Sequence, residues 1–372
     1  DIPEFVFSYM KNGEKLYGVP TYQMLCVESG LYAPKVLAGK YLNEEALIRV
    51  LSEKPTLGNE FLDVIEDYLA KVKADGKIGY GIDHWIDISS KGFERLVDYF
   101  AYRIDNDSCK VELIFETPEF KNYSIRKSEW YKKGYIRQDA LSSTDSQVGK
   151  ENGNVMWMST GGIGAAESAS KKYNMEINYY PFDPTNNYFI PMSNTAVGTC
   201  VMANSKYVNE SVQLLNLLYS EKGKDLYNIL VFGIEGEHYK KLGNDKIETL
   251  YIGNATQNDK YGLYKWIVGN AKFAYDTQGD SEGFKDYVFN KVNSSKNISK
   301  MIGFMPDTTA ISTKLAQILA VKGEYFNSLM TGSLPKAEEV YDEFIGKIHK
   351  AGSEEVKVEL QRQVDEFLSK SK

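Results

Sequence analysis

The sequence predicts an α/β fold with mainly parallel sheets, which the order of its segments supports, and its length and hydrophobicity bound the architecture further. Short apolar segments typical of strands alternate with amphipathic segments typical of helices along most of the chain. The length of 372 residues allows two domains, each with a core of its own. No run of 18 apolar residues is present, so no membrane-spanning helix is predicted.

The first elements are a hairpin and a helix. Asn12-Gly13 is typical of a tight turn leading into a strand at Lys15–Val19. A helix is predicted over Glu60–Lys73, with Asn59 as its N-cap and Gly76 as its stop. Four apolar residues at helical spacing would form its buried face: Leu62, Ile65, Leu69 and Val72.

The next two segments are a short strand and an amphipathic segment. The strand is predicted at Ile78–Ile82. The amphipathic pattern of Phe93–Ile104 predicts a helix, which would place Arg95 and Arg103 on its solvated face.

In the middle of the chain, strands and helices alternate. Several breaker residues over 181–187 interrupt this pattern. The predicted elements are a buried strand at Asn154–Met158, a helix at Gly162–Tyr173, strands at Ile177–Tyr180 and Val197–Ala203, and a helix at Asn209–Leu218.

The C-terminal part of the sequence is predicted to be helical. Three helices are expected, at Thr308–Met330, Pro335–Ala351 and Glu354–Leu368. Asp307 is suited to capping the first of them, and Pro335 suits a first-turn position in the second.

Composition excludes several classes of partner. The net charge of −7 argues against nucleic acid, because phosphate binding requires clustered Lys and Arg. The three cysteines (Cys26, Cys109 and Cys200) are far apart and odd in number, which argues against a disulfide framework or a zinc knuckle. The three histidines are scattered as well, so neither a metal site nor a cofactor is predicted.

The stretch at 155–168 resembles the outline of a dinucleotide-binding loop and reads VMWMSTGGIGAAES. In a G-x-G-x-x-G/A fingerprint, Gly162 and Gly164 would be followed by Glu167, whose carboxylate would lie beside the pyrophosphate. A nucleotide role is therefore disfavoured. Two interpretations remain: the glycines allow tight strand-to-helix packing, or the free N–H groups at the helix start bind ligand hydroxyls or carboxylates.

Several stretches resemble family 1 extracellular solute-binding proteins of ABC sugar importers, in particular their lipoprotein subgroup. The resemblance runs from Gly13 to Leu368, and the order and spacing of the stretches are specific together. They read GEKLYGVPTYQ from residue 13, SEWYKKGYIRQDA from 128, NTAVGTCVMANS from 194, YVNESVQLLNLLYSEKG from 207, YNILVFGIEGEHYKK from 227 and VYDEFIGKIHKAGSEEVKVELQRQVDEFL from 340.

The resemblance implies a two-lobe, type II periplasmic-binding-protein-like fold with three interlobe crossovers. The crossovers are expected near Pro20–Met24, Met192–Val197 and Met301–Asp307. One lobe would comprise residues 1–20 and 192–300, and the other 21–191 and 301–372. In this family the first crossover strand follows roughly a hundred residues of βαβ units. The first lobe is therefore expected to be incomplete here, and the lipid-bearing cysteine lies outside this chain.

The resemblance also implies a function. The chain is expected to capture a carbohydrate, specifically an oligosaccharide, in an interlobe cleft that closes by a hinge motion. It would serve ABC permease subunits as a cell-surface lipoprotein, meeting the membrane only through its lipid anchor. The alternative is a carbohydrate-active enzyme such as a glycoside hydrolase, although no motif places the required pair of carboxylates. A G-x-S-x-G nucleophile elbow is absent as well.

The candidate ligand-binding residues lie where strands and crossovers end. Asp83 and Trp85 follow a predicted strand, and Trp85 either stacks on a sugar ring or anchors the next helix. Trp266 is also a candidate, with a core position as its alternative, whereas Asp307 is either a ligand or a helix cap. Trp157 and Trp130 are expected in the core. The remaining candidates are Tyr22, Gln23, Ser159, Thr160 and Gly161.

Overall fold

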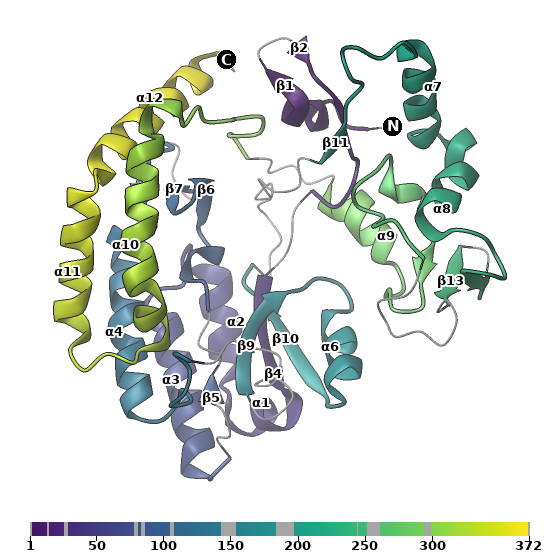
Figure 1. Cartoon of the computed structure of the whole chain (residues 1–372). Helices are drawn as coiled ribbons and strands as arrows, with labels where there is room; N and C mark the ends of the chain where they lie inside the picture. Colours follow the sequence, from purple (N-terminus) through teal and green to yellow (C-terminus); the bar gives the residue numbers. More distant parts are fainter. Residues whose placement is uncertain are drawn as a thin grey trace. The chain divides into compact units, whose positions relative to one another are not determined.

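The computed structural model describes most of the chain (Figure 1). The described residues are 2–12, 15–25, 29–77, 81–82, 86–104, 108–142, 154–183, 197–243, 245–250, 261–293 and 299–370. They divide into two compact units, which are treated separately below. Unit 1 comprises Asp1–Val27 and Asn187–Phe304, and unit 2 comprises Glu28–Asn186 and Met305–Lys372. None of the described helices is long and apolar enough to cross a lipid bilayer.

Unit 2 is built on a four-stranded sheet with helices on both faces. The strand order is β10 (Ile177–Pro181), β4 (Ser29–Pro34), β9 (Asn154–Thr160) and β5 (Gly81–Ile82). The other elements of unit 2 are α1 (Lys35–Tyr41), α2 (Glu44–Glu53), α3 (Asn59–Ala74), η2 (Ile88–Ser90), β6 (Phe93–Val97), β7 (Phe100–Arg103), β8 (Glu112–Leu113), η3 (Ile114–Glu116), α4 (Pro118–Lys132), α6 (Ala165–Tyr173), η8 (Thr309–Ile311), α10 (Ser312–Thr331), α11 (Ala337–Lys350) and α12 (Ser353–Lys370).

The two faces of this sheet are covered by different helices. On one face, Tyr32, Trp157 and Ile177 pack against Ala169 of α6. On the other face, Phe182 meets Phe61 of α3 edge to face, with ring centroids 6.3 Å apart. Strand alternation separates these two sets of side chains, because successive residues of a strand point to opposite faces. The sheet therefore lies in the middle of an α/β/α arrangement.

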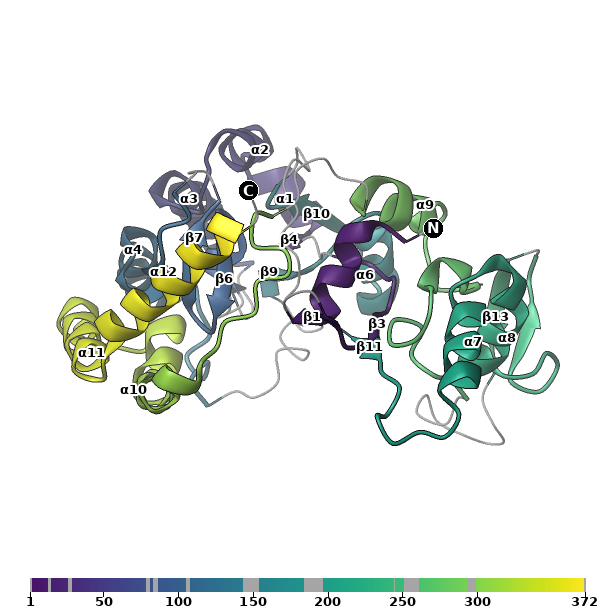
Figure 2. The same cartoon turned by 90° about the horizontal axis from the view of Figure 1, so that it is seen from above.

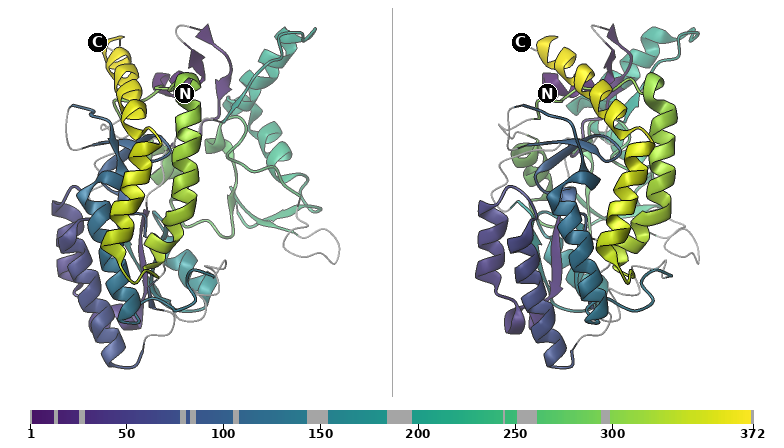
Figure 3. Two further views of the ribbon diagram at one scale, coloured as in Figure 1. Left: turned by 60° about the vertical axis from the view of Figure 1, so that its left-hand side comes forward. Right: turned by 90° about the vertical axis from the view of Figure 1, so that its left-hand side faces the viewer.

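A layer of helices completes unit 2. Helix α3 packs on α4, and α4 packs on α10 and α11 (Figure 3). Helix α3 forms because apolar residues recur at helical spacing and bury one face, and it ends where Gly76 adopts a φ of 66°. Phe115 lies at the centre of an aromatic cluster, with its ring 5.1 Å from Phe120 and 5.2 Å from Phe344. The C-terminal helices thus share one core with the segment before α4.

Unit 1 contains smaller sheets and two apolar cores. Helix α7 packs on α8 (Figure 2). One core is centred on Tyr227 and Ile247, and the other on Tyr22 and Val288. The elements of unit 1 are η1 (Glu4–Met10), β1 (Lys11–Asn12), β2 (Lys15–Leu16), β3 (Val19–Pro20), β11 (Gly198–Thr199), α7 (Val208–Leu218), η5 (Glu221–Gly223), α8 (Lys224–Phe232), β12 (Tyr239–Lys241), β13 (Lys246–Thr249), η6 (Ala271–Phe273), β14 (Asp276–Thr277), α9 (Phe284–Asp286) and the π-helical η7 (Tyr287–Val292).

The predicted parallel character of the sheets is wrong. Strand β4 pairs antiparallel with both β9 and β10, and only β5 with β9 and β13 with β14 pair in parallel among the described strands. The chain enters unit 2 at β4. That strand is therefore not placed by a crossover helix, which is what normally makes neighbouring strands parallel.

The helix predicted over Phe93–Ile104 is instead the hairpin of β6 and β7. Asp98 adopts a φ of 50°, a left-handed conformation that reverses the chain in the middle of the segment. Arg103 is accordingly not a solvated helix residue, because its side chain is 20% exposed and pairs with Glu112 and Glu119.

Smaller corrections concern strand lengths and caps. The strands predicted at Lys15–Val19 and Val197–Ala203 are limited to short paired segments, because β3 and β11 pair over only two residues each. The N-cap of α3 is Gly58, and Asn59 is its first residue. Trp130 and Trp157 lie in the core, as predicted.

Candidate functional site

The carboxyl end of β9 in unit 2 presents three of the predicted residues. Ser159 is half-buried and Thr160 is exposed at the last two positions of the strand, and Gly161 follows. Pairing of Ser159 with Gly30 fixes the strand, and the Tyr32 hydroxyl donates to the Thr160 carbonyl at 2.6 Å. The structure therefore holds this backbone rigidly while it leaves the Thr160 side chain accessible.

The glycines after β9 are required by the local geometry. A Cβ atom on Gly161 would lie 2.1 Å from the Tyr179 ring, far closer than any real contact. Gly162 and Gly164 adopt φ angles of 120° and 71°, which other residues rarely tolerate. Helix α6 begins directly afterwards, at Ala165. Both interpretations of the stretch remain compatible with this geometry, because close packing and an open helix start occur together.

A polar network lies against the same strand. The Asp87 N–H donates to the Met158 sulfur at 3.2 Å, which holds Asp87 beside β9. One oxygen of the Asp87 carboxylate accepts from the N–H of Ser89 at 3.0 Å and from its hydroxyl at 2.6 Å. The other oxygen accepts from Nη2 of Arg95, which also donates to the Ser89 hydroxyl at 2.7 Å. Two hydrogen-bonding side chains of opposite charge are thus fixed at the end of β9.

The ring of Tyr99 lies under this network. The Arg95 guanidinium stands 4.5 Å from the ring centroid, and the Lys322 ammonium of α10 stands 4.9 Å from it. Phe115 stacks on the same ring with centroids 4.4 Å apart. Burial raises the pKa of the Tyr99 hydroxyl, and the nearby Arg95 charge opposes this only in part. The Tyr99 ring therefore supports Arg95 from below, and Phe115 packs against the same ring.

Sequence reasoning missed Asp87, Ser89, Arg95 and Tyr99. Asp87 and Ser89 follow directly on the predicted candidates at 83 and 85, which lie outside the described residues. No clear signal for Arg95 is present in the sequence, because residues 93–97 and 100–103 do not alternate between polar and apolar side chains.

The candidates in unit 1 lie together around one core. Tyr22 is 5% exposed, and its backbone N–H donates to the Gly269 carbonyl at 3.0 Å. The Gln23 carbonyl accepts from the Asn293 side chain at 2.7 Å. Trp266 is half-buried beside the same core, with its ring 6.3 Å from that of Phe284. These contacts favour supporting roles for all three residues.

Asp307 is exposed, and its contacts lie in the C-terminal helical region. Its carboxylate accepts from the Thr309 N–H at 2.9 Å, and this bond lowers the pKa of the carboxyl group. Its backbone contacts Gln363 of α12. The Asp307 side chain therefore binds the start of the turn η8, whereas α10 itself begins later than predicted, at Ser312, with Ile311 as its N-cap.

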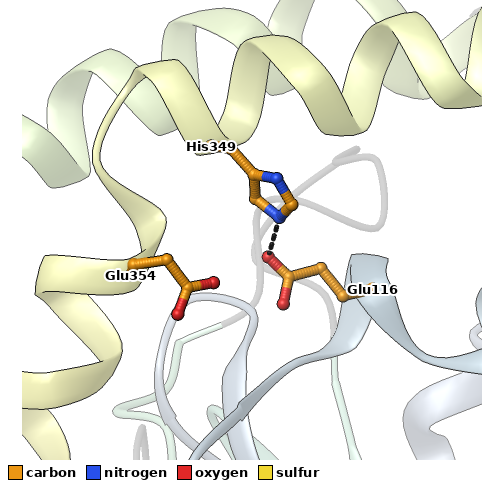
Figure 4. Close-up of side chains that lie close together, drawn as sticks. All are labelled: Glu116, His349 and Glu354. Carbon is orange, nitrogen blue, oxygen red and sulfur yellow. Dashed lines mark hydrogen bonds and ion pairs between the residues drawn. The ribbon is translucent and has the colours of Figure 1, made fainter.

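Three other side chains in the described part of unit 2 could be metal ligands. Figure 4 shows His349 and Glu116 pointing toward one another, with Nε2 and Oε1 3.0 Å apart, and Glu354 beside them. The Lys357 ammonium lies 2.6 Å from a carboxylate oxygen of both Glu116 and Glu354. Because this ammonium already pairs with both carboxylates, the group is best understood as an ion-pair junction between η3, α11 and α12.

A surface cavity of about 430 Å³ lies at the edge of the unit 2 sheet. It is lined by β10 residues from Asn178 to Pro181, by Ile48 and Leu51 of α2, and by Ala166 of α6. The polar groups beside it satisfy one another, because Asn178 and the Tyr180 hydroxyl both donate to Glu44. It therefore offers few free polar groups for recognising a ligand.

The amino-acid sequence is similar to those of known proteins. Residues 300–369 match a family model described as a domain of unknown function, DUF3502. A carbohydrate ABC transporter substrate-binding protein of Streptococcus pneumoniae is 25% identical over 277 residues, which is 73% of this chain and 55% of that protein. The chain therefore spans about half the length of the curated relative that it matches.

Solved structures share the fold. The N-glycan transport solute-binding protein NgtS from Streptococcus pneumoniae superposes with a TM-score of 0.76 at 21% identity, covering 100% of this chain and 79% of that chain. Its complex with Man5GlcNAc gives a TM-score of 0.67 with the same coverage and identity. An HMO-binding solute-binding protein from Bifidobacterium longum infantis gives 0.55 at 15% identity, covering 97% and 79%.

These likenesses confirm the resemblance seen in the motifs and the predicted two-lobe, type II periplasmic-binding-protein-like fold class. The named relatives are binding proteins of transport systems and not enzymes. In sequence and in fold, the chain is a relative of the solute-binding proteins of carbohydrate ABC transporters.

Proposed function

We propose that this chain captures an oligosaccharide, without altering it, as the substrate-binding component of an ABC transporter. The observation that carries the proposal is the match over 277 residues to a carbohydrate ABC transporter substrate-binding protein. ABC permease subunits would receive the ligand, and the protein would work at the cell surface, held there by a lipid anchor.

The end of β9 supports this function chemically. Sugars present hydroxyl groups that both donate and accept, together with apolar ring faces. Asp87 supplies an acceptor and Arg95 supplies donors, and both are held by their ion pair and by the contact of Arg95 with the Tyr99 ring. We propose that these residues act with Ser159, Thr160 and Gly161, and with Asp83 and Trp85. Tyr22, Gln23 and Trp266 remain separate candidates within unit 1, where they lie around one apolar core.

Isothermal titration with a panel of oligosaccharides tests the proposal. Arg95→Gln removes the guanidinium and leaves Asp87 without its partner, so the affinity is expected to fall tenfold or more, which corresponds to about 1.4 kcal/mol. The matched control is Arg362→Gln, because Arg362 also pairs with carboxylates but lies exposed on α12. Equal affinities for the wild type and the Arg95 variant would remove Arg95 from the site. Failure of every oligosaccharide to bind would refute the proposed function.

A further inference from the structure

All six arginines of the sequence lie in unit 2, and each is already paired with a carboxylate. The described residues include all six of these arginines. The pairs are Arg49 with Glu53, Arg95 with Asp87, Arg103 with Glu112 and Glu119, Arg126 with Asp63 and Glu66, Arg137 with Asp139, and Arg362 with Glu359 and Glu366.

This pairing matters for the recognition of acidic sugars. A carboxylate ligand is best held by an arginine whose planar donors form two parallel hydrogen bonds with it. Arg95 is the arginine beside the end of β9, and Asp87 already holds it with the help of Ser89. A sugar carboxylate would therefore have to displace Asp87, leaving that carboxylate without its cation.

Among the described residues, the remaining charges around Tyr99 are balanced. Lys322 adds one cation over the ring, and Asp98 adds a carboxylate that acts on the same hydroxyl. With Arg95 and Asp87 these make two positive and two negative groups. Unit 1 contains as many acidic as basic residues, so the net charge of −7 resides in unit 2. The field of this unit therefore disfavours the approach of an anion.

Resting on the function proposed above, we propose that the ligand is a neutral oligosaccharide, without carboxylate or sulfate groups on the sugar that meets Arg95. In this arrangement the Asp87–Arg95 pair remains intact and forms hydrogen bonds to uncharged hydroxyls. Asp87 acts as the residue that sets this specificity, because it occupies the guanidinium that an acidic sugar would require.

The test uses the neutral oligosaccharide that binds tightest in the panel and a matched form whose terminal CH₂OH is oxidised to a carboxylate. The two probes have almost the same size, so a difference in affinity reports on charge. The oxidised form is expected to bind at least tenfold more weakly at 50 mM NaCl. The deficit should shrink at 500 mM NaCl, because salt screens the repulsion.

A variant of Asp87 tests the proposed role of this residue separately. Asp87→Asn frees the Arg95 guanidinium, so the ratio of the two affinities should move at least fivefold toward the oxidised probe. Tighter binding of the oxidised probe to the wild-type protein would overturn the inference while leaving the proposed function intact. An unchanged ratio in Asp87→Asn would overturn the role of Asp87. If neither probe binds, the proposed function itself fails.

Discussion

At the end of β9, the backbone of Gly161 passes so close to Tyr179 that even a methyl group has no room. The atoms that it would meet, 2.1 to 2.4 Å away, belong to the Tyr179 ring, which is itself packed against Tyr32. The close approach places the ring beside the start of the loop. The position of the Tyr179 ring therefore requires glycine at residue 161.

Gly161→Ala is expected to lower the free energy of unfolding of unit 2 by about 1–3 kcal/mol, because the ring must move to admit the methyl group. It should also weaken oligosaccharide binding. The matched control is Gly346→Ala on α11, where a Cβ atom meets nothing within 4 Å. That change should stabilise by about 0.5–1 kcal/mol, since alanine favours a helix interior. Urea denaturation measures both, and equal effects would contradict the packing argument.

Trp85 provides a second test at the residue scale, argued from the sequence because the residue lies outside the described ranges. An indole ring that stacks on a sugar contributes strongly to affinity, so Trp85→Ala should cost about 1–3 kcal/mol of binding free energy. The substitution should lower the free energy of unfolding by less than it weakens the free energy of binding. Calorimetry combined with thermal unfolding separates these outcomes. Normal affinity with a large loss of stability would show instead that Trp85 anchors the adjoining segment.

At the scale of elements, Arg103 joins the β6–β7 hairpin to the start of α4. Its Nη1 and Nη2 atoms donate to the two oxygens of Glu119 at 2.8 and 3.0 Å, and its Nε donates to Glu112. Burial alone would raise the pKa of the Glu119 carboxyl, but the hydrogen bonds from Arg103 outweigh it and lower the pKa below the ordinary value of 4.5. The pair therefore stabilises the ionised carboxylate in the folded state.

The lowered pKa of Glu119 determines how the stability of the fold depends on pH. A carboxyl group whose pKa is lowered by folding contributes stability above its unfolded pKa and loses it as the pH falls through the folded value. Arg103→Gln should lower the free energy of unfolding by roughly 2–3 kcal/mol at pH 7. As the pH falls below 4.5 the difference between the variant and the wild type should shrink, and it should vanish below the lowered pKa of Glu119, because the protonated carboxyl no longer needs a cation. A constant difference in urea melts from pH 7 to pH 3 would contradict the assignment.

Helices and strands were predictable from the sequence where the apolar residues follow a single helical or strand period along the whole element. Helix α3 and strand β9 have apolar patterns of sufficient length, so their type and their buried residues were predicted correctly. The β6–β7 hairpin was not predictable, because two four- to five-residue strands around a left-handed Asp98 also match a helical period.

The same limit applies to the site. Ser159, Thr160 and Gly161 could be proposed from sequence because they end a recognisable strand. The Asp87–Arg95 pair could not, because its members meet only through a hairpin that the sequence did not reveal. The antiparallel direction of β4 was hidden for a similar reason, since strand direction depends on pairing between segments that are distant in the chain.

At the scale of the whole molecule, the two units differ in how well they cover apolar surface. In unit 1, large apolar side chains on and around α7 and α8 remain exposed. They include Met202 at 71%, Tyr207 at 68%, Val212 at 53%, Ile229 at 54%, Ile234 at 54% and Tyr264 at 66%. Exposed apolar area adds nothing to folding stability, so unit 1 should be the less stable of the two.

Limited proteolysis tests this difference. The earliest cuts are expected in residues 1–20 and 240–300. Cleavage between 187 and 304 should leave two fragments of unit 2 that elute together on gel filtration, because both contribute to one aromatic core around Phe115. First cuts within α3 or α4 would contradict the predicted order of stability.

We propose that the protein binds a neutral oligosaccharide and releases it unchanged. The most direct test is calorimetric titration with the tightest-binding neutral oligosaccharide, followed by mass spectrometry of the ligand recovered after prolonged incubation. We expect saturable binding of one ligand per chain and complete recovery of the intact oligosaccharide. Shortened or transferred glycans would contradict it, as would the absence of any binding.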